Sequence, residues 1–274
     1  MALNERQTEL LRLLKEQKKV NVRALAKLFY VSEATIRRDL TEMENLGLVE
    51  RSHGGAILPE NSEEISIFFR MEKNANEKER VATKALPHIP PFKSVYIDSS
   101  STALALAERM DFSGKTVVTN NLQTAIQLSK KPNVTLIILG GTVQYNTISS
   151  TGGWTARQLE DFSFDLIISS CAAVLNGHTH ERSLEQKEIK RVAFAHSLKK
   201  VLLIDHTKFT SHGTYRFAAL EDYDLVVTDA PPPKELDGRD IKFMAGLYPE
   251  LDFVKGEHVN NTDRVICTIR RKEA

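Results

Sequence analysis

The stretch Ser32-Glu33-Ala34-Thr35-Ile36-Arg37-Arg38-Asp39-Leu40 decides the fold of the N-terminal part of this chain. Ser32 is a favoured N-cap residue, and Ile36, Leu40 and Met43 follow at helical spacing, so we expect a helix that buries one stripe. Its opposite face carries small, cationic or hydrogen-bonding side chains, which suit the major groove of DNA. For the arginine pair alone, an ordinary solvated helix face is the alternative. The predicted DNA contacts are Ser32, Ala34, Thr35, Arg37, Arg38, Thr41 and Asn45.

Two shorter helical patterns precede this stretch. Leucines in residues 6–17 follow a helical period, and the apolar residues of segment 22–29 fall on one helical face. The second helix can pack beneath the third because only the turn Tyr30-Val31 separates them. Gly47 then ends the third helix. Three helices in this order are typical of a helix-turn-helix domain.

A glycine-centred hairpin is expected after these helices. Residues 48–51 and 56–58 flank His53-Gly54-Gly55, whose glycines can supply the positive φ of a tight turn. Arg51 and His53 near the tip are expected to touch the DNA backbone or minor groove. The spacing equally permits a hairpin that merely covers the helical core. The sequence therefore predicts a wing, and residues 1–58 form a winged helix-turn-helix domain.

The composition is that of an ordinary two-domain protein. The chain has 274 residues, 41% of them hydrophobic and 27% charged, with a formal net charge of +1. No apolar run approaches the roughly 18 residues of a membrane span, so we expect a cytoplasmic location. The two cysteines lack any ligand spacing, and His178-x-His180-Glu181 has no helical i, i+4 histidine pair. We expect no metal and no disulfide framework.

The larger, C-terminal part alternates strand-like and helical segments. Apolar runs at 94–98, 116–119, 134–139, 165–170, 200–205 and 224–229 alternate with helical patterns at 103–109, 122–130 and 185–197. This alternation predicts an α/β domain with a parallel or mostly parallel sheet. We divide the chain into a linker and connecting helix at 59–80, the α/β domain at 81–236, and an extension at 237–274 that is either a solvated basic tail or a late strand.

Three loops that follow predicted strands are rich in hydroxyl and amide groups. Parallel sheets bind ligands at the carboxyl ends of their strands, where helix N-termini favour anions. Singly, each loop is more often a simple helix cap, but three in succession favour a phosphorylated ligand. No Walker A or G-x-G-x-x-G sequence occurs, so no nucleotide cofactor is expected. The loop residues assigned to the ligand are Asp98, Ser99, Ser100, Ser101, Thr102, Thr119, Asn120, Gly140 and Gly141.

The motifs resemble those of the DeoR family of bacterial transcriptional regulators. The likeness covers the helix motif at 32–40, the segment Arg51-Ser52-His53-Gly54-Gly55-Ala56, the loops above, Lys190-Arg191 and Asp205-His206-Thr207-Lys208-Phe209. It implies a winged helix-turn-helix joined to a domain similar in fold to sugar-phosphate isomerases and CoA transferases. The implied function is repression of sugar-metabolism genes under control of a sugar phosphate. On this basis we add three residues to the expected effector site: Glu185, Lys190 and Lys208. At position 186 this chain has Gln186, where the family usually has an acidic residue.

An enzymatic function is the main alternative. Glu185, Asp205 or His206 would then serve as acid or base on a bound phosphosugar, as an aldose–ketose isomerase requires. The attached DNA-reading domain favours sensing without turnover, so we expect no enzyme activity. Helix-turn-helix proteins usually bind repeated half-sites as symmetric dimers, so a homodimer or homotetramer on double-stranded operator DNA is expected. Activation instead of repression depends on operator position and stays open.

Overall fold

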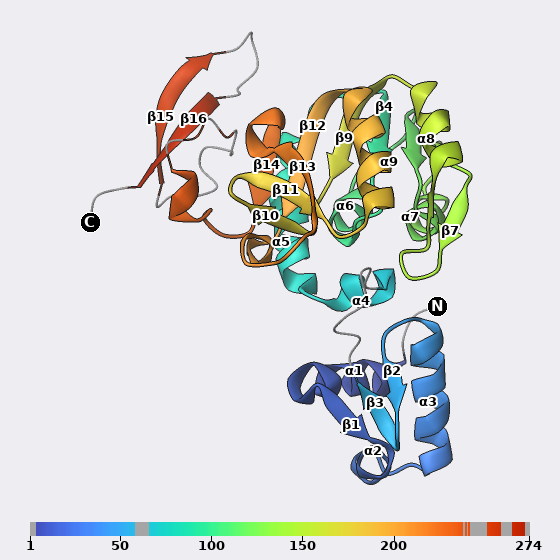
Figure 1. Ribbon diagram of the computed structural model, residues 1–274. Coiled ribbons are helices and arrows are strands. Elements are labelled where there is room, and N and C mark those ends of the chain that lie inside the picture. The colour runs from blue at the N-terminus through green and yellow to red at the C-terminus, as the bar shows by residue number, and fades with distance from the viewer. Residues whose placement is uncertain are drawn as a thin grey trace. The chain divides into compact units, whose positions relative to one another are not determined.

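The computed structural model describes residues 4–57, 66–237, 239, 241, 251–258 and 265–271. The chain divides into two compact units, residues 1–73 and 74–274 (Figure 1). Residues 58–65, which include the start of the expected linker and connecting helix at 59–80, lie outside the described residues. In the part of the chain that is described, no helix is long and apolar enough to cross a bilayer.

The first unit is built from three helices and a small sheet. Its elements are α1 (Glu5–Gln17), β1 (Lys19–Asn21), α2 (Val22–Leu28), α3 (Glu33–Asn45), β2 (Glu50–Ser52), β3 (Gly55–Ile57) and α4 (Ile67–Glu72). The leucines of α1, Val22 and Leu25 of α2, and the apolar stripe of α3 form one core. The helix order and the buried stripe of α3 agree with the sequence-based expectation.

The wing has one more strand than the sequence predicted. β2 and β3 pair as an antiparallel hairpin, and β1 adds to the other side of β3. Gly54 has the expected positive φ of 75°, but Gly55 is required for a different reason. A Cβ on Gly55 would lie 1.8 Å from the carbonyl oxygen of Val20, so only glycine lets the two strands approach. The expectation that both glycines supply a positive φ therefore holds for Gly54 and is wrong for Gly55, which is needed for the close approach of the strands.

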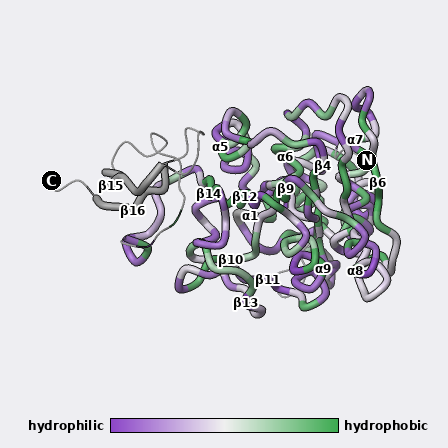
Figure 2. The backbone as a smooth tube through the Cα atoms, turned by 90° about the horizontal axis from the view of Figure 1, so that it is seen from above, coloured by the Kyte–Doolittle hydropathy of each residue, from purple (hydrophilic) through white to green (hydrophobic). Residues whose placement is uncertain are grey.

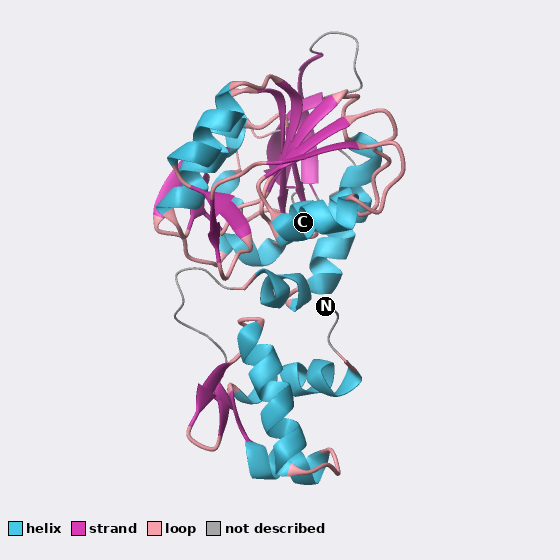
Figure 3. Ribbon diagram, turned by 90° about the vertical axis from the view of Figure 1, so that its right-hand side faces the viewer, coloured by secondary structure: helices cyan, strands magenta, loops and turns pink. Residues whose placement is uncertain are grey.

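The second unit contains a six-stranded, fully parallel sheet with the order β14-β12-β9-β4-β5-β6. Helices lie on both sides of it (Figure 3), and hydrophobic residues follow its strands (Figure 2). The predicted α/β class with a parallel sheet is confirmed. The strands are β4 (Ser94–Ile97), β5 (Thr116–Thr119), β6 (Thr135–Ile138), β9 (Phe164–Ser169), β12 (Ser197–Ile204) and β14 (Leu225–Thr228).

Alternate residues along the strands build separate cores on the two faces of this sheet. Val201 and Leu203 of β12 pack with helices α5 (Ala75–Ala85) and α6 (Ser101–Ala107). On the other face, Ile167 of β9 packs with α8 (Gly153–Glu160) and α9 (Leu184–Ala195). The remaining helices are α7 (Leu122–Leu128) and the 3-10 turns η1 (Leu86–His88), η2 (His206–Phe209), η3 (Leu220–Asp222) and η4 (Lys234–Leu236).

Several short elements were missed by the sequence patterns. They are the hairpin β7 (Thr142–Gln144) and β8 (Ser149–Thr151), helix α8, and a second sheet of β10 (Ala173–Leu175), β11 (His178–Glu181) and β13 (Tyr215–Ala219). Each strand has three to five residues, which is too short for a clear period. In the C-terminal extension, β15 (Leu251–His258) pairs with β16 (Val265–Arg271), and 242–250, 259–264 and 272–274 lie outside the described residues.

Candidate functional site

Helix α3 presents two chemically different faces. The hydroxyl of Ser32 accepts a hydrogen bond from the backbone N–H of Thr35 at 3.1 Å and so caps the helix. Ile36, Leu40 and Met43 are fully buried. Thr35 is half-buried, and the other side chains assigned to DNA on this helix are exposed: Ala34, Arg37, Arg38, Thr41 and Asn45. The structure therefore brings these positions to one solvent-facing surface, which we call the α3 face.

The two arginines of the α3 face form surface ion pairs. Arg37 lies 3.3 Å from Glu33 and Arg38 lies 4.0 Å from Glu42, and their side chains are 52% and 72% exposed. Exposed pairs of this kind contribute about 0–1 kcal/mol, so a phosphate or guanine can replace the carboxylate at small cost. Asp39, in the same motif, is instead 1% exposed and accepts two hydrogen bonds from Arg6 of α1, at 2.5 and 3.1 Å. Asp39 therefore fixes α3 to α1.

The two wing residues assigned to DNA have different environments. His53 is exposed beside Gly54 at the tip of the hairpin. Arg51 reaches back to α3, where its guanidinium donates to the hydroxyl of Thr41 at 3.1 Å and to the carbonyl of Arg37 at 3.4 Å. Arg51 therefore lies beside Arg37 and Thr41 of α3. The sequence spacing had instead placed it near the tip of the hairpin.

The loop after β4 supplies hydroxyl groups at the carboxyl end of the sheet. Ser100 caps α6 by accepting from the N–H of Ala103, and its own hydroxyl donates to Asp98 at 2.5 Å. Ser101 and Thr102 are buried in the first turn of α6. Ser99 is half-buried, and its hydroxyl donates to the side-chain oxygen of Gln186 at 2.9 Å. Of the four hydroxyls predicted here, the structure leaves Ser99 and Ser100 nearest to solvent.

Beneath this loop lies a buried ionic cluster. The ammonium of Lys190 lies 2.5 Å from Glu181 and 3.1 Å from Asp98, and it donates to the carbonyl of Ser170 at 2.5 Å. All three side chains are at most 10% exposed. Although burial opposes the charge, the two carboxylates raise the pKa of Lys190 above its ordinary value. The lysine therefore stays charged, and its three donors are already used by the protein.

Two further loops make hydrogen bonds to neighbouring elements, one set buried and one exposed. The amide of Asn120 accepts from the hydroxyl of Tyr96 at 2.9 Å and donates to the carbonyl of Ser150 at 2.8 Å, and Thr119 is fully buried. Gly140 donates its N–H to Gln158 at 3.1 Å. These bonds tie the end of β5 to β4 and β8, and the chain after β6 to α8, and Thr119 and Asn120 lie in the interior.

Gly141 is needed for a close approach in the same region. Its φ is 152°, and a Cβ there would lie 2.0 Å from the hydroxyl oxygen of Thr155 and 2.9 Å from the carbonyl of Thr151. That hydroxyl donates to the carbonyls of Gly140 and Thr151. Glycine is therefore required by packing, and the backbone of residues 140–141 stays exposed.

The turn after β12 carries the last predicted effector residue. Lys208 is half-buried in η2 and interacts electrostatically with Glu181 and Cys171. Burial raises the pKa of the Cys171 thiol to about 12, so this cysteine stays protonated and unreactive at neutral pH. Asp205 is fully buried, and its Oδ2 has no hydrogen-bond partner within the described structure.

The candidate acid–base and metal residues are mostly engaged elsewhere. His206 pairs with Asp229 at 2.9 Å, and Glu185 is exposed and accepts from Ser183 at 3.1 Å. Glu181 is bound to Lys190, and His178 contacts Arg216 and the carbonyl of Asn176. Among the described residues, no group of His, Cys, Asp and Glu is arranged to hold a metal ion.

Gln186 is a functional candidate that the motif analysis did not assign. Its amide oxygen accepts from Ser99, and its amide nitrogen donates to Ser149 at 2.7 Å and to Thr147 at 3.4 Å. Gln186 lies one helical turn before Lys190, so both side chains share a face of α9. That spacing is the sequence signal that could have identified it.

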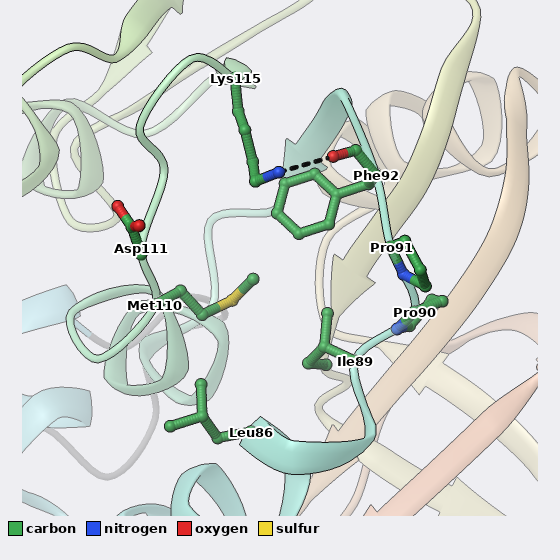
Figure 4. Close-up of a pocket in the computed structure, with 8 residues that line it drawn as sticks. All are labelled: Leu86, Ile89, Pro90, Pro91, Phe92, Met110, Asp111 and Lys115. Carbon is green, nitrogen blue, oxygen red and sulfur yellow. Dashed lines mark hydrogen bonds between the residues drawn. The ribbon is translucent and has the colours of Figure 1, made fainter.

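A cavity of about 240 Å³ lies at the opposite end of the strands (Figure 4). It is lined by Leu86, Ile89, Pro90, Pro91, Phe92, Met110, Asp111 and Lys115. These residues precede β4 and β5, whereas the hydroxyl-rich loops follow them. Lys115 donates to the carbonyl of Phe92 at 2.9 Å. None of the residues assigned to the effector lines this cavity.

Comparison with known proteins agrees with this two-part organisation. Residues 6–62 match the DeoR-like helix-turn-helix domain, and residues 73–230 match the DeoR C-terminal sensor domain. The chain is 36% identical over 232 residues to the HTH-type transcriptional regulator GolR of Listeria innocua, covering 82% of this chain and 90% of that protein. It is 32% identical over 235 residues to the glycerol-3-phosphate regulon repressor of Escherichia coli, covering 85% and 93%.

A solved ribose 5-phosphate isomerase from Methanocaldococcus jannaschii covers 50% of this chain and 55% of its own, with a TM-score of 0.36 and 11% identity. The two domain matches and the two relatives confirm the family that the sequence motifs indicated. The chain belongs to the DeoR family of transcriptional regulators.

Proposed function

We propose that this protein is a repressor of sugar-metabolism genes whose affinity for operator DNA is controlled by a phosphorylated sugar or polyol. The proposal rests on the presence of two features in one chain. The first unit has the exposed α3 face, and the second unit has hydroxyl-rich loops at the carboxyl ends of a parallel sheet. The first suits a major groove, and the second suits a phosphate. The name of the Escherichia coli relative supports a phosphorylated effector.

The phosphate is proposed to bind at Ser99, Ser100 and the exposed backbone of residues 140–141, with Lys208 supplying positive charge. Lys190 is proposed to act from below by holding Asp98 in place, since its own donors are used. Asp98 in turn accepts from the N–H of Ser100 at 2.9 Å and from the N–H of Ser170 at 3.0 Å. The buried cluster therefore orders the loop that would meet the ligand.

Sugar phosphates are expected to raise the melting temperature of the sensor unit, and the matching free sugars are not. The reason is that the ammonium of Lys208, and the hydroxyls of Ser99 and Ser100 if they turn away from Gln186 and Asp98, can donate to an oxyanion. A thermal-shift screen should compare each pentose, hexose and triose phosphate with its unphosphorylated counterpart at equal concentration. Equal stabilisation by both members of a pair would contradict the assignment of the loops to phosphate.

Arg37→Ala is expected to weaken operator binding by about 1–3 kcal/mol if its guanidinium contacts a base. Stability should change little, because the lost pair with Glu33 is exposed. A gel-shift titration measures the effect. Arg12→Ala is the matched control, since Arg12 is an arginine on α1 in a comparable exposed pair with Glu9. Identical titrations for wild type and Arg37→Ala would remove Arg37 from the interface.

Coupling between the two functions is proposed to run through α5. Asn74, just before this helix, donates its side-chain amide to Thr207 at 3.0 Å and to Asp205 at 3.4 Å. Arg80 of α5 lies 3.3 Å from Asp229, which also pairs with His206. The turn that carries Lys208 is thus tied to the first helix of the sensor unit. Allosteric coupling is typically about 1–3 kcal/mol, or roughly 5- to 150-fold in DNA affinity.

Two finer features belong to the same proposal. A homo-oligomer is proposed because helix-turn-helix domains usually bind two half-sites related by symmetry.

A sensor without turnover is proposed in preference to an isomerase, because His206 and Glu185 are held by Asp229 and Ser183. Incubation of the purified protein with pentose and hexose phosphates, followed by assay of their interconversion, tests the second point. Turnover would favour the enzyme.

A further inference from the structure

The two edge strands of the parallel sheet have different surroundings. β14 and β6 each pair with one neighbouring strand, β12 and β5 respectively. All four residues of β14 are buried. In β6, by contrast, Thr135 and Ile138 are exposed, and Leu136 and Ile137 are only half-buried. Within the described part of the chain, one edge of the sheet is therefore covered and the other is open.

The open side of β6 presents backbone groups that no described strand pairs. The N–H groups of Thr135 and Leu139 donate to backbone carbonyls on the β5 side, at 3.0 and 2.9 Å. Backbone groups of successive residues in a strand point to opposite sides, so those of Leu136 and Ile138 point away from β5. Such a row of donors and acceptors is a template for a further strand.

Most of the exposed large hydrophobic side chains described in the second unit gather around this edge. Helix α7 packs on β6 (Figure 2), and α7, β7 and α8 lie together on one side of the unit (Figure 1). Thr155 of α8 donates to the carbonyl of Gly140 at 2.8 Å, which holds the start of α8 next to the end of β6. We define the β6 surface as five side chains that are 45–68% exposed: Ile126, Ile138, Val143, Tyr145 and Trp154.

The same part of the chain carries no charge. Although 27% of all residues are charged, no Asp, Glu, Lys, Arg or His occurs in residues 116–129 or 132–156. These ranges contain β5, α7, β6, the hairpin β7–β8 and the start of α8. The buried centres of protein interfaces are poor in charged residues and rich in Tyr and Trp. A neutral surface has no electrostatic attraction for DNA or for an anionic membrane, so its composition suits a protein partner.

We propose that the β6 surface is the interface between two copies of this chain. About a twofold axis, two β6 strands run antiparallel, so the outward N–H and C=O groups of each can meet those of the other. The two sheets then become one continuous sheet, and the apolar side chains around each edge are covered. The surface is compatible with its own copy because it has no like charges to repel. This inference rests on the homo-oligomer of the proposed function and names the surface that forms it.

The test is the association of the full-length protein, measured by analytical ultracentrifugation over a range of concentrations. We expect Ile138→Lys to raise the dissociation constant of the dimer at least about a hundredfold, because a symmetric interface would bury two unpaired ammonium groups. If wild type is a tetramer, this variant should fall to dimers. Leu198→Lys is the matched control, since Leu198 is an exposed apolar strand residue of the same sheet, on β12 and outside the β6 surface. It should stay within about twofold of wild type.

Two further measurements report on the surface itself. The amide of Leu136 should exchange slowly in the wild-type dimer and quickly in Ile138→Lys, whereas the amide of Thr135, bonded on the β5 side, should be protected in both. Trp154 is the single tryptophan and is 68% exposed, so its emission should lie at shorter wavelength in the dimer than in the variant. Rapid exchange of Leu136 in an associated wild type would overturn the inference.

A variant without added charge keeps the test if Ile138→Lys does not fold. Trp154→Ala removes an exposed side chain, so the unit should fold normally, and truncation of an interface tryptophan should weaken association at least about tenfold. An unchanged dissociation constant in that variant would overturn the inference.

The association of wild type separates this inference from the proposed function. A wild-type dimer that Ile138→Lys leaves equally tight would remove the β6 surface from the interface and leave the homo-oligomer standing. Wild type that stays monomeric at every concentration would overturn both the homo-oligomer and this inference. DNA binding and effector binding would be unaffected by either result, because the gel-shift and thermal-shift experiments test them separately.

Discussion

Replacing Lys190 with methionine is expected to lower the stability of the sensor unit by about 3–5 kcal/mol, the usual cost of breaking a buried ion pair. For a unit of this size, the loss corresponds to a fall of about 6–20 °C in melting temperature. The ammonium of Lys190 is the counter-ion of Asp98 and Glu181, 3.1 and 2.5 Å away. Without it, two carboxylates stay buried with no positive partner in contact.

Fluorescence of Trp154, the single tryptophan of the chain, and far-UV circular dichroism can follow this unfolding. Lys187→Met is the matched control, because Lys187 lies on the same helix in a partly exposed pair, 3.8 Å from Glu188. It should cost less than about 1 kcal/mol. A similar loss of unfolding free energy in Lys190→Met and Lys187→Met would show that the buried cluster stabilises the fold no more than the partly exposed pair does.

The pH dependence of Lys190→Met gives an independent check. Without the ammonium, burial raises the folded-state pKa of Glu181 above its unfolded value. The folded state then binds more protons than the unfolded state between those values, so the deficit should shrink as the pH falls from 8 towards 5. Adding Glu181→Gln should also restore part of the loss, because it removes one of the unpaired charges. A deficit that is constant with pH and unaffected by Glu181→Gln would contradict the electrostatic explanation.

Leu40→Ala is expected to destabilise the DNA-binding unit by about 2–5 kcal/mol, because it removes a fully buried side chain from the centre of a small core. Domains of this size have a total stability of only several kcal/mol. We therefore expect a large unfolded fraction of this unit at 37 °C and loss of operator binding. Amide hydrogen exchange in residues 5–57 measures the first effect, and a gel-shift titration measures the second.

Arg37→Ala is the matched comparison for Leu40→Ala, because the two residues lie three positions apart on α3, with Arg37 exposed and Leu40 fully buried. Arg37→Ala should lose DNA binding and keep the fold of the unit. Leu40→Ala should lose both DNA binding and the fold. The thermal transition reported by Trp154 in the sensor unit should be the same in both. If Leu40→Ala keeps normal hydrogen-exchange protection, the core assignment of α3 is wrong.

Features that depend on local periodicity were predictable from the sequence. The stripe of Ile36, Leu40 and Met43 identified the buried face of α3, and the cap at Ser32 marked its start. The apolar runs at 94–98 and 116–119 correctly indicated parallel strands, because such strands are buried on both faces and need no alternation. The three-residue strand β1 could not be found in this way, since its partner β3 lies more than thirty residues later.

The sequence by itself determined the family, the two-part organisation and the end of the sheet at which the polar loops gather. Only the tertiary structure decided what each side chain does there: Arg51 contacts α3, Lys190 is enclosed by Asp98 and Glu181, and Gln186 bridges Ser99 and Ser149. The physical reason is that capping and periodicity act within a few residues. Ion pairs and hydrogen bonds across 9 to 92 positions, as for Lys190, form only when the strand order brings their elements together.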